Sequence, residues 1–119
     1  MNVLVLDEDA LTTQQTALLL SRAGHTVHAA ITVTGAMTML KSFPTDLVLL
    51  SLKTPGGDLY HAIRSSAQWE MLPILVVTGL PQSEWNGART DPYAKVLRKP
   101  CVENGELLQA VDEFAGALK

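Results

Sequence analysis

The sequence has little that would tie the chain to a disulfide framework, a metal cluster or a membrane. Its one cysteine, Cys101, excludes an internal disulfide and a cysteine-based metal cluster. Its three histidines lie among apolar and small residues without the spacing of metal ligands, which indicates structural roles. The longest apolar runs are far shorter than the ~20 residues of a transmembrane helix, and no basic leader precedes the acids at positions 7–9. We therefore predict a cytoplasmic protein that neither enters a membrane nor carries a signal peptide.

Positive charge is also scarce. Nine Lys and Arg residues against twelve Asp and Glu residues give a formal net charge of −3, and the basic residues are scattered along the sequence. Such a chain has no long-range attraction for phosphates, so we expect no direct binding of nucleic acid. The apolar fraction of 47% and the charged fraction of 18% are typical of a packed globule. At 119 residues, the length predicts one domain over residues 1–119.

Short β-rich apolar runs alternate with segments of helical period along the whole chain. This alternation is typical of βα units around a buried parallel sheet. The predicted strands are 3–6, 26–30, 47–50, 74–77 and 94–97, and the predicted helices are 10–23, 34–43, 58–66, 82–88 and 102–118.

Two capping residues and one apolar face define the expected helices further. Asp9 is placed to cap the first helix, Gly24 to end it, and Asp58 to cap the third helix. The apolar positions of the first helix predict a single buried face. This face would consist of Leu11, Ala17, Leu18, Leu20 and Ala23.

Strands that are apolar along their whole length need helices on both faces of the sheet. We therefore predict an α/β fold: a doubly wound, five-stranded parallel sheet in the order 2-1-3-4-5, within a flavodoxin-like three-layer sandwich. In such folds the chemistry lies beyond the carboxyl ends of the strands. The candidate residues at those ends are Asp7 to Asp9, Ser51 to Thr54, Thr78 and Gly79, and Arg98 to Cys101.

In this order along the chain, these residues resemble the receiver domain of two-component response regulators, the CheY-like domains. Asp7 and Glu8 match the family's acidic pair, Thr78 matches its threonine at the end of strand 4, and Lys99 with Pro100 matches its Lys-Pro. The stretch DLVLLSLKTPGGD, residues 46–58, has the family's rhythm around strand 3. The resemblance covers essentially all 119 residues and implies a role in phosphorelay signal transduction.

Ser51 departs from the pattern, because the family has at this position the aspartate that accepts a phosphoryl group with the help of Mg²⁺. A carboxylate is ionised at neutral pH and can attack directly, whereas a serine hydroxyl is a weak nucleophile unless a base takes its proton. The resemblance with this departure implies a pseudo-receiver in which ordinary phosphorelay to Ser51 does not occur.

The charge of the expected pocket changes in the same direction. The family collects three carboxylates against one lysine and so attracts a divalent cation, whereas this chain keeps only Asp7 and Glu8. Strand-like alternation would point Lys53 into the same pocket, where Lys99 also lies. We therefore expect an ion pair of Lys53 or Lys99 with Asp7 or Glu8 in place of the metal, no cofactor, and weak or absent Mg²⁺ binding.

The surface that receivers commonly present to partners also differs. The family often carries an aromatic residue three positions before the lysine, and here that position is Val96. Segment 82–88 has weak helical periodicity, with Gly87 inside it and Pro92 beyond it. We expect protein partners to bind the face formed by the fourth helix, the fifth strand and the final helix, with a homodimer as one option.

The expected function is regulatory and non-enzymatic: a protein-interaction module in signalling. Two alternatives stay open, which are a conventional Mg²⁺-dependent receiver that uses Asp7 or Glu8 as the phosphoacceptor and a small-molecule sensor that uses the altered pocket. Simpler roles stay open for single residues as well. The acids can be solvated residues at a helix entrance, and Thr78 can serve only to satisfy a backbone group.

Overall fold

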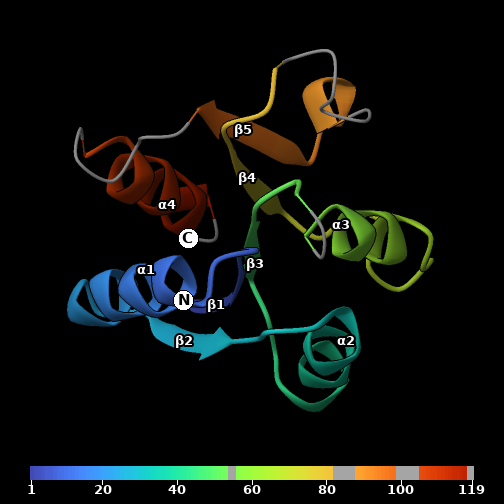
Figure 1. The fold of residues 1–119 in the computed structure, drawn as a ribbon, viewed down its shortest axis with the longest axis horizontal. Coiled ribbons are helices and arrows are strands. Elements are labelled where there is room, and N and C mark those ends of the chain that lie inside the picture. Colours follow the sequence, from blue (N-terminus) through green and yellow to red (C-terminus); the bar gives the residue numbers. More distant parts are fainter. Residues whose placement is uncertain (54–55, 82–87, 99–104, 118–119) are drawn as a thin grey trace.

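A computed structural model describes residues 1–53, 56–81, 88–98 and 105–117 as one twisted parallel sheet between two layers of helices (Figure 1). The strand order is β2-β1-β3-β4-β5, so the predicted doubly wound 2-1-3-4-5 topology is confirmed. The strands are β1 (Asn2–Leu6), β2 (Thr26–Ala29), β3 (Leu47–Leu50), β4 (Ile74–Thr78) and β5 (Ala94–Arg98).

The helices divide between the two faces of the sheet. Helices α1 (Ala10–Arg22) and α4 (Glu106–Ala117) cover one face, and α2 (Val33–Ser42) and α3 (Gly56–Arg64) cover the other (Figure 1). Strand β3, at the centre, is buried at every position, since both of its faces lie under helices. Alternate β3 side chains enter separate clusters, with Leu47 and Leu49 on the α1 side and Val48 and Leu50 on the α2 side.

Helix α1 begins as the sequence predicts, but of its predicted apolar face only Leu20 is fully buried. The Asp9 side chain caps it by accepting a hydrogen bond from the Leu11 N–H at 3.1 Å, and Gly24 follows its end at a φ of 96°. Leu11 and Leu18, expected in the core, are 59% and 51% exposed. The buried residues of α1 are Thr13, Thr16 and Leu20.

Threonine can replace leucine on this buried face because its hydroxyl group has backbone partners. Thr13 Oγ1 accepts a hydrogen bond from the Asp7 N–H and donates to the carbonyl oxygen of Asp9, both at 3.1 Å. A buried hydroxyl with such partners carries little desolvation cost. These bonds also hold the end of β1 against the first turn of α1.

The third helix starts earlier than predicted. It begins at Gly56, so Asp58 lies inside its first turn and does not cap the helix. In the first turn, the positive end of the helix dipole stabilises a carboxylate. The predicted fourth helix lies largely outside the described residues, which show a 3₁₀ turn, η2, at Ala88–Thr90. The final helix is described from Glu106, and residues 102–104 of its predicted range lie outside the described part.

The described helices include none that is both long and apolar enough to cross a bilayer.

Candidate functional site

The sheet register brings the predicted site residues of three strands to one edge. Leu6 of β1 is paired with Leu50 of β3, so the residues that follow them, Asp7 and Ser51, leave neighbouring strands at the same level. Thr78, which ends β4, is paired with Arg98, which ends β5. The carboxyl ends of β1, β3 and β4 therefore place an acid, a serine and a threonine side by side, as the topology predicts.

Ser51 is buried, with 2% of its surface exposed, and its position is set by the backbone. Its N–H donates to the carbonyl oxygen of Leu6 at 3.2 Å, which extends the β1–β3 pairing by one residue. The first residues of α3 pack directly on this position: a Cβ atom on Gly56 would overlap the Ser51 carbonyl oxygen, and one on Gly57 would lie 2.5 Å from the Leu52 carbonyl oxygen. Residue 51 is thus held by main-chain contacts that do not involve its side chain.

The acidic pair takes part in the turn that joins β1 to α1. Asp7 is half-buried, and its Oδ1 accepts a hydrogen bond from the Asp9 N–H at 2.9 Å. Glu8 is exposed. One oxygen of the Asp7 carboxylate is therefore used to fix the turn, in addition to any role in binding.

Thr78 is the last residue of β4, and Val96 lies in the middle of β5. Thr78 is 1% exposed, and its hydroxyl oxygen accepts a hydrogen bond from the Leu80 N–H at 3.0 Å. In this bond the threonine hydroxyl satisfies a backbone N–H group, which is one of the two roles considered for Thr78 from the sequence. Val96 is partly buried and packs against the core cluster on the α2 and α3 side of the sheet.

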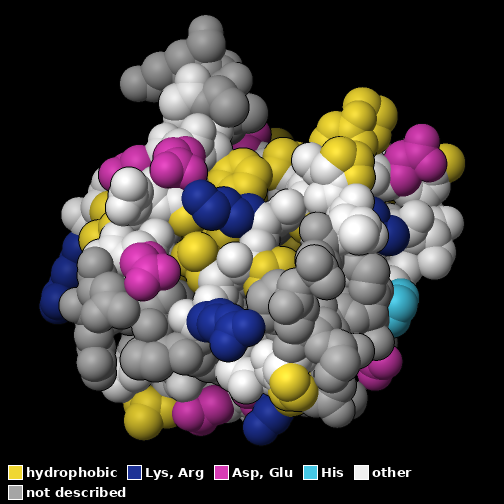
Figure 2. All heavy atoms as spheres, turned by 90° about the horizontal axis from the view of Figure 1, so that it is seen from above, with side chains coloured by type: hydrophobic (Ala, Val, Ile, Leu, Met, Phe, Trp, Pro, Cys, Tyr) yellow, Lys and Arg dark blue, Asp and Glu magenta, His cyan; other side chains and the backbone are white. Residues whose placement is uncertain are grey.

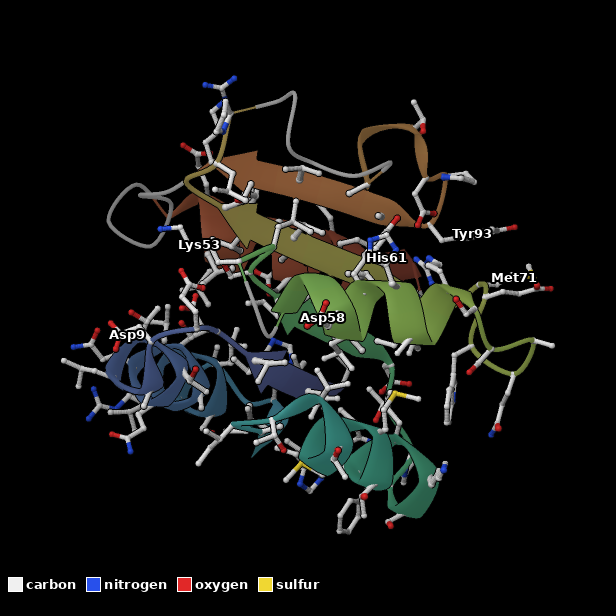
Figure 3. All side chains as sticks on the ribbon, turned by 45° about the vertical axis from the view of Figure 1, so that its right-hand side comes forward. Asp9, Lys53, Asp58, His61, Met71 and Tyr93 are labelled. Carbon is white, nitrogen blue, oxygen red and sulfur yellow. The ribbon has the colours of Figure 1, made fainter. Side chains whose placement is uncertain are left out.

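Lys53 is exposed and makes no ion pair among the described residues, so its predicted place in the pocket stays a prediction. Its side chain is exposed, because β3 ends at Leu50 and the strand-like alternation does not continue through the turn at residues 51–53 (Figure 3). The ion pairs within the described part of the chain are Arg64–Asp91 and Lys95–Glu113, so Lys53 makes none with Asp7 or Glu8. Lys99, the other predicted partner, lies outside the described residues, as does Cys101.

A small pocket of about 210 Å³ opens between the first turn of α1 and the end of β2. Its lining includes Asp7 and Glu8, with Gln14 of α1 and Ile31, which follows β2. Asp7 and Glu8 therefore line a pocket next to the end of β2, and Asp7 also lies level with Ser51 on the other side of β1.

The described residues contain no group of three or more His, Cys, Asp and Glu side chains that could hold a metal ion. Oxygen ligands of the kind that Mg²⁺ prefers are present in Asp7 and Glu8, which could supply two carboxylates. The weak Mg²⁺ affinity inferred from the missing third carboxylate stays a prediction.

A second polar cluster, which the sequence did not indicate, lies at the opposite edge of the sheet. Asp91 Oδ2 accepts hydrogen bonds from Arg64 Nε and from the Tyr60 hydroxyl, both at 2.6 Å. Arg64 also donates to the carbonyl oxygens of Leu72 at 2.7 Å and of Trp69 and Tyr93, both at 3.2 Å. This Arg64 network joins α3, the turn before β4 and the approach to β5.

The Arg64 network shifts the pKa values of two of its members. Burial, the hydrogen bond to Asp91 and the negative charge of Asp91 raise the pKa of Tyr60 to about 12. Burial alone would raise the pKa of Asp91, but the hydrogen bonds from Tyr60, Arg64 and the Tyr93 backbone outweigh it and lower that pKa. The network is therefore built for an ionised Asp91 and a neutral Tyr60.

We expect the stability of the fold to fall between pH 10 and about pH 12 as a result of the Tyr60 shift. The raised pKa means that the neutral phenol stabilises the fold fully below the unfolded value of 10.0, and that this contribution is lost as the pH rises through the folded value of about 12. Urea unfolding of the wild type and of Tyr60→Phe across this window measures it. The wild type should lose stability more steeply, and identical pH profiles would contradict the assignment.

Comparisons with known proteins support the fold and its sequence resemblance. No family model matches the chain. The chain is 32% identical over 76 residues to the transcriptional regulatory protein AfsQ1 of Streptomyces coelicolor, a match that covers 64% of this chain and 33% of that protein. The chain thus spans about a third of the length of this curated relative.

Two solved structures are similar over nearly their whole length. A response regulator receiver protein from Pseudomonas putida is 29% identical, with a TM-score of 0.82 and coverage of 94% of this chain and 95% of that one. The chemotaxis response regulator CheY4 of Vibrio cholerae is 21% identical, with a TM-score of 0.80 and coverage of 95% and 97%.

Proposed function

Because this chain is a receiver-type domain with the CheY-like fold of two-component response regulators, we propose that it acts as a regulatory protein-interaction module without a phosphorylation cycle at residue 51. The observation that carries the proposal is the buried Ser51 at the end of β3, where the family's pattern has an aspartate. Function then comes from a fixed conformation or from a shift on partner binding. On this proposal the protein is no enzyme and works in the cytoplasm.

Ser51 lacks the means to replace an aspartate as a nucleophile. A serine hydroxyl needs an adjacent base, and Asp7, the acid that leaves the neighbouring strand at the same level, already uses one carboxylate oxygen to accept the Asp9 N–H. An ionised carboxylate needs no base. The substitution therefore removes the reactive group while the backbone that presents it is kept.

The partner surface that we propose includes β5 and α4. On the face drawn in Figure 2, which looks onto the β5 side of the molecule, Lys and Arg side chains stand singly among acidic and apolar ones. Lys95 of β5 pairs with Glu113 of α4 at 2.8 Å across this surface, and both side chains are largely exposed. Such a mixed surface suits a protein partner better than a phosphate backbone.

The pocket beside β2 favours a second candidate function, the sensing of a small molecule. Its volume of about 210 Å³ and its mixed lining suit a small polar ligand. A ligand that binds the folded state raises the melting temperature, so a thermal-shift screen tests this candidate. An unchanged melting temperature across the screened ligands would count against it.

We expect acetyl phosphate with Mg²⁺ to leave the wild-type chain unlabelled and to label Ser51→Asp. The aspartate restores both the ionised nucleophile and the third carboxylate that favours a divalent cation. Intact mass spectrometry detects the added phosphoryl group. Ser51→Asn, which is neutral and similar in size to aspartate, is the matched control and should stay unlabelled.

Two results of the same experiment would contradict the proposal. The first is a hydroxylamine-labile label on the wild type, which would indicate that Asp7 or Glu8 serves as the acceptor. Asp7→Asn and Glu8→Gln would then identify the residue, and a beryllofluoride complex of the wild type should show shifted spectra. The second is an unlabelled Ser51→Asp chain, which would show that the charge at residue 51 is not the missing element.

A further inference from the structure

Strand β2 has one open edge that carries neither proline nor a lysine, arginine or acidic side chain. Among the described residues β2 pairs with β1 alone, and Figure 1 shows it at the border of the sheet with α1 and α2 on either side. Its residues Thr26 to Ala29 include no proline, lysine or arginine and no acid. The other border strand, β5, carries the exposed Lys95 and Arg98. Charges of this kind on an edge strand oppose edge-to-edge pairing, and β2 lacks them.

The hydrogen bonds of β2 identify the groups that face outward. The N–H groups of Thr26 and Ala30 donate to the carbonyl oxygens of Met1 and Val5 of the β1 segment, at 3.1 and 2.9 Å. In a parallel pair such residues alternate, so Val27 and Ala29 direct their N–H and C=O groups away from β1. The backbone N–H and C=O groups of these two residues thus point out of the open edge of the sheet.

We propose that β2 pairs in an antiparallel manner with β2 of a second copy of the chain, forming one continuous sheet across a two-fold axis. Such pairing matches outward residues with outward residues, so Val27 lies opposite Ala29 of the second copy and Ala29 opposite its Val27. Each of these two pairs exchanges two hydrogen bonds. The axis then passes at His28, which faces His28 of the second copy.

The neighbouring register is less favourable because one of its donors is already used. Shifted by one step, Val27 would face itself and Ala29 would face His25. The His25 N–H, however, already donates to the carbonyl oxygen of Leu20 at 3.1 Å in the turn after α1. In the register centred on His28, by contrast, every donor is an outward N–H group of Val27 or Ala29, so neither of its two pairs loses a bond.

The charges at the two ends of β2 complement each other in this arrangement. The last turns of α1 and α2 carry the exposed Arg22 and Lys41 near the amino end of β2, and Asp7, Glu8 and Asp9 lie near its carboxyl end. An antiparallel pair sets the basic end of one copy beside the acidic end of the other. A partner of the same sequence thus supplies opposite charge at both ends.

The side chains around the edge leave room for a second copy and offer it apolar contacts. Ala29 is exposed, and the side of α1 that borders the pocket next to it carries Ala10 and Gln14. On the other face, the His28 ring stacks on Phe43 with centroids 4.4 Å apart, and Phe43 remains 45% exposed. Ile31, just past the strand, is 78% exposed. Pairing would cover part of this apolar surface.

Sedimentation velocity of the full chain over a wide concentration range tests the proposal, and we expect a reversible dimer. Ala29→Pro removes an outward N–H that β1 does not use, and it should weaken the dimer about thirtyfold, because two intermolecular hydrogen bonds are lost across the symmetric pair. Lys95→Ala, at an exposed position of β5 on the other border of the sheet, serves as the control for a surface substitution and should leave the dimer intact.

A charge exchange at His28 tests the register. His28→Lys and His28→Glu should each be monomeric, since the same charges would face each other at the axis, and an equimolar mixture should form a heterodimer. The same pair of substitutions at the exposed Met71, which Figure 3 shows beyond the end of α3, should leave the dimer unchanged. Circular dichroism confirms that each variant is folded.

A wild type that stays monomeric at every concentration would overturn the proposal, as would a dimer that Ala29→Pro does not weaken or charged His28 variants that fail to combine. None of these results bears on residue 51, so the proposed regulatory role and the dimer fail separately.

Discussion

Replacing Gly56 with alanine is expected to prevent stable folding or to cost about 3 kcal/mol or more of unfolding free energy. The added Cβ would overlap the Ser51 carbonyl oxygen, which is a main-chain atom and cannot rotate away as a side chain could. Relief would require moving the first turn of α3 or the end of β3, and β3 is the fully buried centre of the sheet. Urea unfolding followed by circular dichroism measures the loss.

Two other glycines provide graded controls for this prediction. Gly57→Ala brings a Cβ to 2.5 Å from the Leu52 carbonyl oxygen and should cost less than Gly56→Ala. Gly116, inside α4, has nothing within 4 Å of its added Cβ, and Gly116→Ala should stabilise the chain by up to about 1 kcal/mol through helix propensity. A Gly56→Ala chain as stable as the wild type would mean that the turn after Ser51 is not as tight as described.

Replacing Arg64 with alanine is expected to destabilise the fold by about 3 kcal/mol. The change leaves the carboxylate of Asp91 without its cation, which is costly because only 9% of that side chain is exposed to water. It also leaves the carbonyl oxygens of Leu72 and Tyr93 without their side-chain donor. Chemical denaturation at neutral pH measures the effect. Hydrogen exchange should rise most in the approach to β5, which the Arg64 network holds.

Matched variants separate the geometry of the guanidinium from its charge. Arg64→Lys keeps the charge but lacks the planar set of donors, so it should recover only part of the loss. Lys95→Ala breaks the exposed pair with Glu113 and should change the stability by at most about 1 kcal/mol. Equal effects of Arg64→Ala and Lys95→Ala would contradict a structural role for the network.

Most of the fold follows from local sequence features. Continuous apolar runs predict buried parallel strands, and β3 matches its predicted bounds at residues 47–50. Asp9 and Gly24 mark the ends of α1 because capping depends on residues close in sequence. Once the strand order is known, it also follows that Asp7 and Ser51 lie next to each other at the carboxyl ends of neighbouring strands.

Other features depend on contacts that periodicity cannot indicate. Thr13 and Thr16 occupy the buried side of α1. For Thr13 the reason is that backbone groups near the turn satisfy its hydroxyl group, which hydrophobicity alone does not predict. Arg64 and Asp91 are 27 residues apart, and nothing local in the sequence indicates that they meet. The orientation predicted for Lys53 relied on strand-like alternation, but β3 ends at Leu50, three residues before the lysine.

The way in which main-chain atoms fix residue 51 has a practical consequence for experiments. Because Gly56 and the carbonyl oxygen of Leu6 set the backbone position of residue 51, different side chains can be introduced at residue 51 without redesigning the loop. Asparagine and aspartate are nearly isosteric, so the comparison of these two variants isolates charge, and serine is the smaller neutral reference. The wild-type chain, with an uncharged side chain at residue 51, is thus a reference against which the electrostatic contribution of a phosphoacceptor carboxylate can be measured.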